Sequence, residues 1–146
     1  MKYDLDLIQE LCSELSLRVA ARSSNEVAVE LDEGTVLIFV NAELEKDSLI
    51  GFEGGGWHYH DDLTCWDGPS STIDLDYFDV LTGLADGAVL ICEQWVDGQL
   101  HDRSLVHRGY VNEFRYMRIG EEIRIRRARS PRPSSEDSIT KQLTKS

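Results

Sequence analysis

The stretch GGGWHYHDD, residues 54–62, holds the side chains of this chain that are best suited to chemistry. In an extended backbone, His58 and His60 face one side and Trp57 and Tyr59 the other, because successive side chains along a strand point to opposite faces. Two imidazoles at this spacing can reach one metal ion, and the neighbouring Asp61 could be a third ligand. The pattern therefore makes His58, His60 and Asp61 candidate metal ligands.

The same stretch allows a small enzyme. A histidine oriented by an aspartate can act as a general base, and a cysteine near a histidine could act as a nucleophile. Further groups able to complete a metal or catalytic site are Asp62, Cys65, His101 and His107. However, the sequence has no HExxH, no GxSxG and no phosphate-loop or cofactor fingerprint. A metal-dependent or histidine-based enzyme is therefore the alternative hypothesis, and no cofactor is expected.

A binding role uses the same residues differently. Trp57, Tyr59 and Trp66 lie among many carboxylates, and Trp and Tyr are frequent hot-spot residues of interfaces. Carboxylates around them would speed the encounter with a basic protein. The predicted partner-binding residues are Glu53, Trp57, Tyr59, Asp61, Asp62, Trp66, Asp67, Asp74 and Asp76. A structural interpretation stays open, in which the glycines form a turn and Trp57 is buried under the sheet.

The charge of the chain is divided unevenly. The net charge is −12, yet residues 103–146 hold eleven bases and only five acids. No Lys or Arg stands between Lys46 and Arg103, a window that contains twelve acids. Such a field attracts a basic partner and repels nucleic acids through their phosphates. The arginines that could instead neutralise these acids within the chain are Arg124, Arg126, Arg127 and Arg129.

Length and composition indicate one soluble globular domain. A chain of 146 residues with 41% hydrophobic and 29% charged residues fits a single core. The cysteines, Cys12, Cys65 and Cys92, form no CxxC pair, so no disulfide framework is expected. The chain has no apolar run of about 18 residues for a membrane span. Its acidic start, MKYDLDLIQELCSEL, does not resemble a signal peptide, so we expect a cytoplasmic protein.

The elements that must position these residues can be expected from their apolar spacing. Apolar residues three and four apart predict a helix from Asp4 to about Arg22. Alternating apolar and polar residues predict a strand over 26–32, and a continuous apolar run predicts a second strand over 35–42. The two strands are expected to pair as a hairpin, with the second at an inner position of the sheet. Residues 43–72 are expected to be irregular, apart from a short strand around Leu49, Ile50 and Phe52.

The second half of the sequence predicts a helix followed by an antiparallel meander of strands. A helix over 74–86, capped by Ser71 or Thr72, is expected to face Phe78 inward and to end at Gly87. Four strands follow, at 88–96, about 99–107, 110–119 and 122–128, with a hairpin turn at Asp97–Gly98.

These elements predict an α+β fold, with an antiparallel sheet of about five to six strands and two helices packed on one face. Residues 1–129 would form the domain, and the polar residues 130–146 a flexible tail.

The stretch GGWHYHDDL, residues 55–63, is similar to Gly-Trp-His-x-His-acid stretches of small bacterial proteins that neutralise secreted toxins. The whole chain, which is acidic, single-domain and without a catalytic signature, resembles these immunity proteins of contact-dependent and type VI systems. The resemblance implies tight binding to a cognate basic toxin, often a nuclease, and no catalysis by the chain itself. Carboxylates in such an inhibitor can take the places of phosphates in the groove of the toxin. The oligomeric state is left open.

Overall fold

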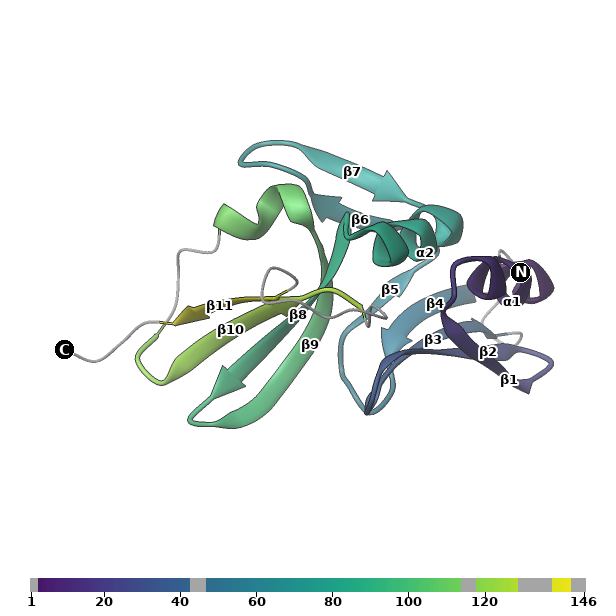
Figure 1. Cartoon of the computed structure of the whole chain (residues 1–146), viewed down its shortest axis with the longest axis horizontal. Helices are drawn as coiled ribbons and strands as arrows, with labels where there is room; N and C mark the ends of the chain where they lie inside the picture. Colours follow the sequence, from purple (N-terminus) through teal and green to yellow (C-terminus); the bar gives the residue numbers. More distant parts are fainter. Residues whose placement is uncertain (1–2, 43–46, 114–117, 129–137, 143–146) are drawn as a thin grey trace.

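The computed structural model describes residues 3–42, 47–113, 118–128 and 138–142. It confirms the expected α+β class. The antiparallel strands form a five-stranded sheet, a four-stranded sheet and a two-stranded ribbon, so the strands beyond the fifth build separate sheets rather than extending the first. Figure 1 shows the two larger sheets at opposite ends of the molecule and the ribbon along one side.

Helix α1 (Leu5–Glu14) is shorter than the expected helix from Asp4 to Arg22. Asp4 caps its start, since the Asp4 carboxylate accepts a hydrogen bond from the Leu7 amide at 3.1 Å. The helix ends because Ser16 takes a left-handed backbone conformation, with φ 60°, and the Leu17 amide donates back to the Cys12 carbonyl at 2.8 Å. The expectation of a helix over 18–22 was therefore wrong, and this segment belongs to strand β1 (Arg18–Ser23).

The five-stranded sheet has the order β1-β2-β3-β4-β5. Strands β2 (Glu26–Asp32) and β3 (Thr35–Ala42) form the expected hairpin, and β3 is the central strand, as its apolar run predicted. Strand β4 (Asp47–Phe52) matches the expected short strand, and β5 (His58–His60) is the edge strand beside it. The inner face of this sheet carries alternate, fully buried side chains of β2, β3 and β4.

The region expected to be irregular contains further strands. Strands β6 (Leu63–Trp66) and β7 (Thr72–Leu75) pair as the two-stranded ribbon, and helix α2 (Tyr77–Asp86) follows. The cap of α2 is Asp76 rather than Ser71 or Thr72. Gly87 ends the helix with φ 89°, as expected.

The four-stranded sheet has the order β11-β10-β8-β9. Strands β8 (Val89–Val96) and β9 (Gln99–His107) form the expected hairpin, and β10 (Glu121–Arg126) is the other expected strand. The strand expected over 110–119 was wrong where the structure describes it, because the 3₁₀ helix η1 (Arg108–Glu113) occupies its beginning. Within the tail that was expected to be flexible, β11 (Ser138–Gln142) pairs with β10. Residues 130–137 and 143–146 lie outside the described residues.

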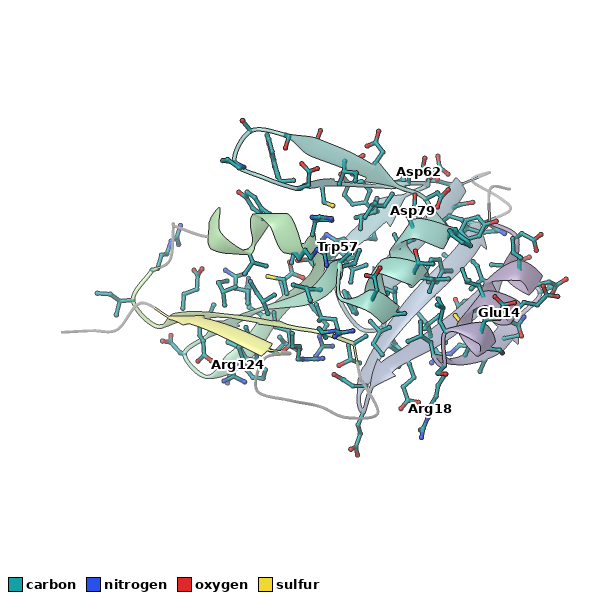
Figure 2. All side chains as sticks on the ribbon, turned by 45° about the horizontal axis from the view of Figure 1, so that its top comes forward. Glu14, Arg18, Trp57, Asp62, Asp79 and Arg124 are labelled. Atoms are coloured by element: carbon teal, nitrogen blue, oxygen red, sulfur yellow. The ribbon has the colours of Figure 1, made fainter. Side chains whose placement is uncertain are left out.

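The main hydrophobic core lies between the five-stranded sheet, the helices and the start of the four-stranded sheet. Helix α1 packs on β1 and β2, helix α2 packs on β7 and β8, and the two helices contact each other. Trp57 lies in the middle of the molecule and packs against this core (Figure 2). Among the described residues, no helix is long and apolar enough to span a membrane.

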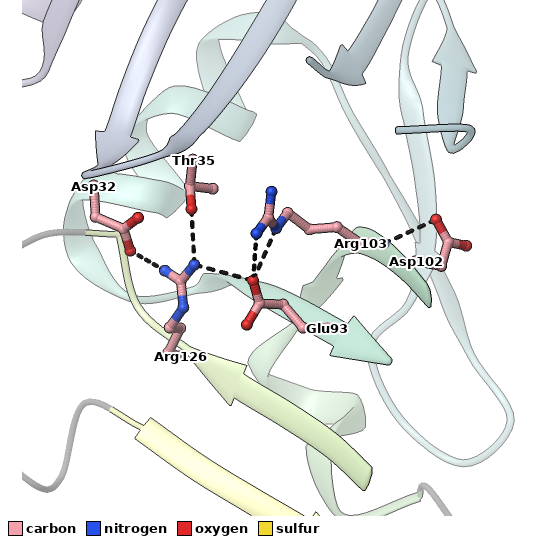
Figure 3. Close-up of polar contacts among 6 residues, drawn as sticks. All are labelled: Asp32, Thr35, Glu93, Asp102, Arg103 and Arg126. Atoms are coloured by element: carbon pink, nitrogen blue, oxygen red, sulfur yellow. Dashed lines mark hydrogen bonds and ion pairs between the residues drawn. The ribbon is translucent and has the colours of Figure 1, made fainter. Parts of the chain in front are cut away.

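A polar network joins the two larger sheets (Figure 3). Glu93 of β8 is only 5% exposed, and its carboxylate accepts hydrogen bonds from Arg103 at 2.8 Å and from Arg126 at 3.3 Å. Arg126 also binds Asp32 and donates to Thr35 at 3.0 Å, both in the β2–β3 hairpin. Burial alone would raise the pKa of Glu93, but the hydrogen bond from Arg103 and the charge of Arg126 more than offset burial and lower the pKa.

Candidate functional site

The β6–β7 ribbon separates an apolar face from a polar face. Its inward side chains, Leu63, Cys65, Ile73 and Leu75, pack on the main core. The opposite face carries Thr64, Trp66, Thr72 and Asp74, which are all exposed. These residues and their neighbours span the outer face of the ribbon, its turn and the start of α2. We define the acidic ribbon surface as Thr64, Trp66, Asp67, Asp74, Asp76 and Asp79.

Neutral donors hold the carboxylates of the acidic ribbon surface. Asp74 accepts a hydrogen bond from the Thr64 hydroxyl at 2.6 Å, and Asp67 accepts one from the Ser71 hydroxyl at 2.5 Å. Asp76 and Asp79 form a capping box, in which each carboxylate accepts the backbone amide of the other residue, at 2.8 and 3.4 Å. These bonds fix the side chains without cancelling their negative charge.

The arginines form their ion pairs on the two larger sheets. Within the described residues, the acids that pair with arginines are Glu26, Glu30, Asp32, Glu53, Glu93 and Glu122. Of the four arginines expected to neutralise acids across strands, Arg126 binds Glu93 and Asp32 of other strands, and Arg124 binds Glu122 of its own strand. Arg127 donates to the Ala85 carbonyl, and Arg129 lies outside the described residues. Among the described residues, no acid of the ribbon or of α2 forms an ion pair with an arginine, so these acids keep their negative charge.

Exposed aromatic rings lie beside these carboxylates. The Trp66 side chain is 48% exposed and stacks on Tyr110 of η1, with ring centroids 6.3 Å apart. Phe78, in the first turn of α2, is 50% exposed. Large aromatic surface next to fixed charges is typical of interface hot spots.

Phe78 was expected to face inward, and this expectation was wrong. The buried face of α2 is formed by Val80, Leu81 and Leu84. The sequence held a signal for this outcome, because Asp76 and Asp79 have the spacing of a capping box and place the helix start at Tyr77. Sequence reasoning thus missed Phe78 as an exposed aromatic residue beside the acidic ribbon surface.

Asp61 and Asp62 lie between the five-stranded sheet and the ribbon. The Asp61 carbonyl accepts a hydrogen bond from the Tyr3 hydroxyl at 2.6 Å. Burial raises the pKa of Tyr3, and the charges of Asp61, Asp62 and Asp47 raise it further. Tyr3 in turn packs edge-on against Tyr77 of α2, at 5.8 Å. Figure 2 shows Asp62 and Asp79 in the same region of the view, and Asp61 directly precedes Asp62 in the chain.

Three predicted partner-binding residues lie on or directly beside strands β4 and β5 instead. Glu53 pairs with Arg22, whose hydrogen bond lowers the pKa of Glu53. Trp57 and Tyr59 are half-buried and pack against the main core, as the structural interpretation of the motif expected for Trp57. The structure does not bring these three side chains to the acidic ribbon surface.

The metal ligands of the enzyme hypothesis, His58, His60 and Asp61, do not form a three-ligand site in the described residues. In the parts of the chain that the structure describes, no group of three or more His, Cys, Asp or Glu side chains could hold a metal ion. His60 bonds to Asp47 rather than to Asp61, at 2.5 Å. Burial raises the pKa of the Cys65 thiol, and the charge of Asp67 raises it further, so the reactive thiolate is disfavoured.

Comparison with protein-family models, with curated proteins and with solved structures found no match for this chain. The candidate site therefore depends on the geometry and charge of this chain alone.

Proposed function

We propose that this protein is an immunity-type inhibitor that acts in the cytoplasm by binding and neutralising a cognate basic antibacterial toxin, with a nuclease as the favoured class. The acidic ribbon surface, with Asp61 and Asp62, is the proposed contact. The chain itself performs no catalysis in this proposal.

One observation carries the proposal. Asp67, Asp74, Asp76 and Asp79 are held by hydroxyl and amide donors, whereas the arginine ion pairs of the described residues involve acids of the two larger sheets. Carboxylates that are fixed but not neutralised repel one another, and a basic partner relieves this repulsion. Arg and Lys side chains that normally bind phosphates also bind carboxylates through charge-assisted hydrogen bonds.

The exposed aromatic rings supply the apolar part of such a contact. Trp66 and Phe78 would enter apolar pockets of the toxin, while the surrounding carboxylates set the orientation and the rate of encounter. Because Tyr110 supports the Trp66 ring from one side, little rotamer freedom would be lost on binding.

The test begins with the full chain as bait in a lysate of its native cells. A captured basic protein must inhibit growth when it is expressed alone, and co-expression of this chain must restore growth. The triple variant Asp67→Asn, Asp74→Asn, Asp76→Asn keeps the hydrogen-bond acceptors and removes three charges. We expect it to lower the association rate with the purified toxin by about 10-fold at low salt and to flatten the salt dependence.

The matched control removes three charges from the exposed side of α1. The variant Asp6→Asn, Glu10→Gln, Glu14→Gln changes the net charge by the same amount at exposed positions, and its association rate is expected to stay close to that of the wild type. Equal rates for the two triple variants would contradict the role of the acidic ribbon surface. A captured protein that is not toxic would contradict the immunity function.

A further inference from the structure

The edge strand β5 presents a pair of histidines on the outer face of the five-stranded sheet. His58 and His60 are exposed, and their neighbours on β4 are Gly51 and Leu49. The two rings meet edge to face, with centroids 5.2 Å apart and an interplanar angle of 72°. The pair thus lies on the opposite side of β5 from Trp57 and Tyr59, which face the core.

Gly51 allows β5 to approach β4 closely at this point. A Cβ atom on Gly51 would lie 3.0 Å from the Trp57 carbonyl and 3.2 Å from the His58 Cβ. A larger residue would crowd the backbone at Trp57 and the Cβ atom of His58, so glycine at position 51 permits this close pairing of the two strands.

The hydrogen bonds of the two rings determine which nitrogens remain available. The His60 Nδ1 lies 2.5 Å from the Asp47 carboxylate, and the His58 Nδ1 lies 3.3 Å from the Gly56 carbonyl. Both oxygens can only accept, so each Nδ1 carries the proton and each neutral ring keeps its lone pair on Nε2. This arrangement is the usual one for histidines that bind metals, whose second nitrogen donates to a carboxylate or a carbonyl.

The separation of the rings fits one shared ion. With metal–nitrogen distances of about 2.0–2.1 Å, a zinc ion lies about 3.2 Å from the centre of each coordinating imidazole, and two rings at the tetrahedral angle of about 109° then lie about 5.2 Å apart. The observed separation of the His58 and His60 centroids is 5.2 Å.

We propose that His58 and His60 bind one divalent transition-metal ion, of the zinc, nickel and copper class that imidazole prefers, through their Nε2 atoms. Asp47 is a positioning residue that orients His60 and fixes its tautomer. Two protein ligands leave the remaining coordination positions to water. This site differs from the ligand set His58, His60 and Asp61 of the sequence analysis, and it is independent of toxin binding.

The test uses the metal-free full chain and zinc alone. Isothermal titration is expected to give one ion per chain, and His58→Ala or His60→Ala should weaken zinc binding at least about 10-fold. Asp47→Ala should weaken it by about 10-fold through loss of the orienting bond, and Asp47→Asn, which keeps an acceptor, should lose less. Imidazole NMR signals of His58 and His60 should shift on zinc addition, which a merely structural role of the pair would not produce.

Two variants serve as matched controls. His101→Ala removes an exposed histidine of β9, and Cys65→Ser removes the half-buried thiol that could bind zinc by itself. Both should bind zinc as the wild type does. The proposal is overturned if the double variant His58→Ala, His60→Ala binds zinc as tightly as the wild type, or if Cys65→Ser abolishes binding. Equal affinities for Asp47→Ala and the wild type would overturn the positioning role of Asp47.

Discussion

At the scale of single residues, the carboxylates of the acidic ribbon surface accept hydrogen bonds that stabilise local structure, and they also carry negative charge. Asp76 shows both, since it caps α2 through the Asp79 amide and remains exposed at the surface. Thr64 and Ser71 bind Asp74 and Asp67 in the same manner on the ribbon. The partner of each acid is therefore a neutral group of its own segment, and an amide side chain can replace the carboxylate without loss of the acceptor.

The cap at Asp76 gives a prediction at this scale. Asp76→Ala removes the hydrogen bond to the Asp79 amide and should lower the free energy of unfolding by about 1–2 kcal/mol. Asp76→Asn keeps an acceptor and should cost only about 0.5 kcal/mol, since it loses the charge near the helix N-terminus. Urea denaturation of the two variants measures both values. Equal losses for Ala and Asn would mean that charge, and not the cap, determines the effect.

At the scale of elements, apolar spacing and turn residues predicted the elements that are held by contacts between neighbouring segments of the chain. The β2–β3 hairpin and the β8–β9 hairpin with its Asp97–Gly98 turn follow from alternation and turn residues, and both are present. Strand β1 could not be predicted, because Leu15 and Val19 continue the helical spacing of α1 and the strand is defined by its pairing with β2. The same holds for the direction of Trp57, which depends on how β5 pairs with β4.

The candidate site could be predicted only in part, because it also depends on contacts between strands that are distant in the sequence. The absence of bases between Lys46 and Arg103 indicated an acidic surface. Which acids meet neutral donors and which meet arginines depends on the pairing of distant strands, as in the contact of Arg22 with Glu53. The sequence could therefore identify the acidic segment, but it could not show that Glu53 meets an arginine and Asp74 a neutral donor.

The contact between η1 and the ribbon gives a prediction at the scale of elements. A Cβ atom on Gly109 would lie well inside van der Waals contact with the Asp67 carbonyl at the turn of the ribbon. Gly109→Ala should therefore displace the ribbon from η1 and lower the free energy of unfolding by about 1–3 kcal/mol. The displacement should also change the fluorescence of Trp66, which stacks on Tyr110. Gly56→Ala, at a glycine with open space around it, should leave both quantities unchanged.

At the scale of the whole molecule, the network around Glu93 connects the four-stranded sheet to the five-stranded sheet. Arg126 and Arg103 both reach the Glu93 carboxylate, and Arg126 continues to Asp32 and Thr35. Arg103 also lies over the Phe52 ring, at 5.8 Å. A buried carboxylate with two guanidinium partners thus ties strands β9 and β10 to the β2–β3 hairpin. Both arginines are used within this network, and neither pairs with an acid of the ribbon.

Glu93→Gln should destabilise the whole fold. It leaves the largely buried guanidinium groups of Arg103 and Arg126 without their shared counter-charge, which should cost about 3 kcal/mol at pH 7. Because the folded-state pKa of Glu93 is lowered, its contribution is present above the unfolded-state pKa of about 4.3 and is lost as the pH falls through the folded-state value. The unfolding free energies of wild type and variant should therefore differ most at neutral pH and converge in acid.

Urea denaturation between pH 7 and pH 3 measures this convergence. Glu122→Gln is the matched control, because Glu122 lies on the same sheet and its partner Arg124 is more exposed than Arg103. The Glu122→Gln variant should lower the free energy of unfolding by less than about 1 kcal/mol. A difference between wild type and Glu93→Gln that stays constant down to pH 3 would mean that the shape of the side chain, and not its charge, joins the two sheets.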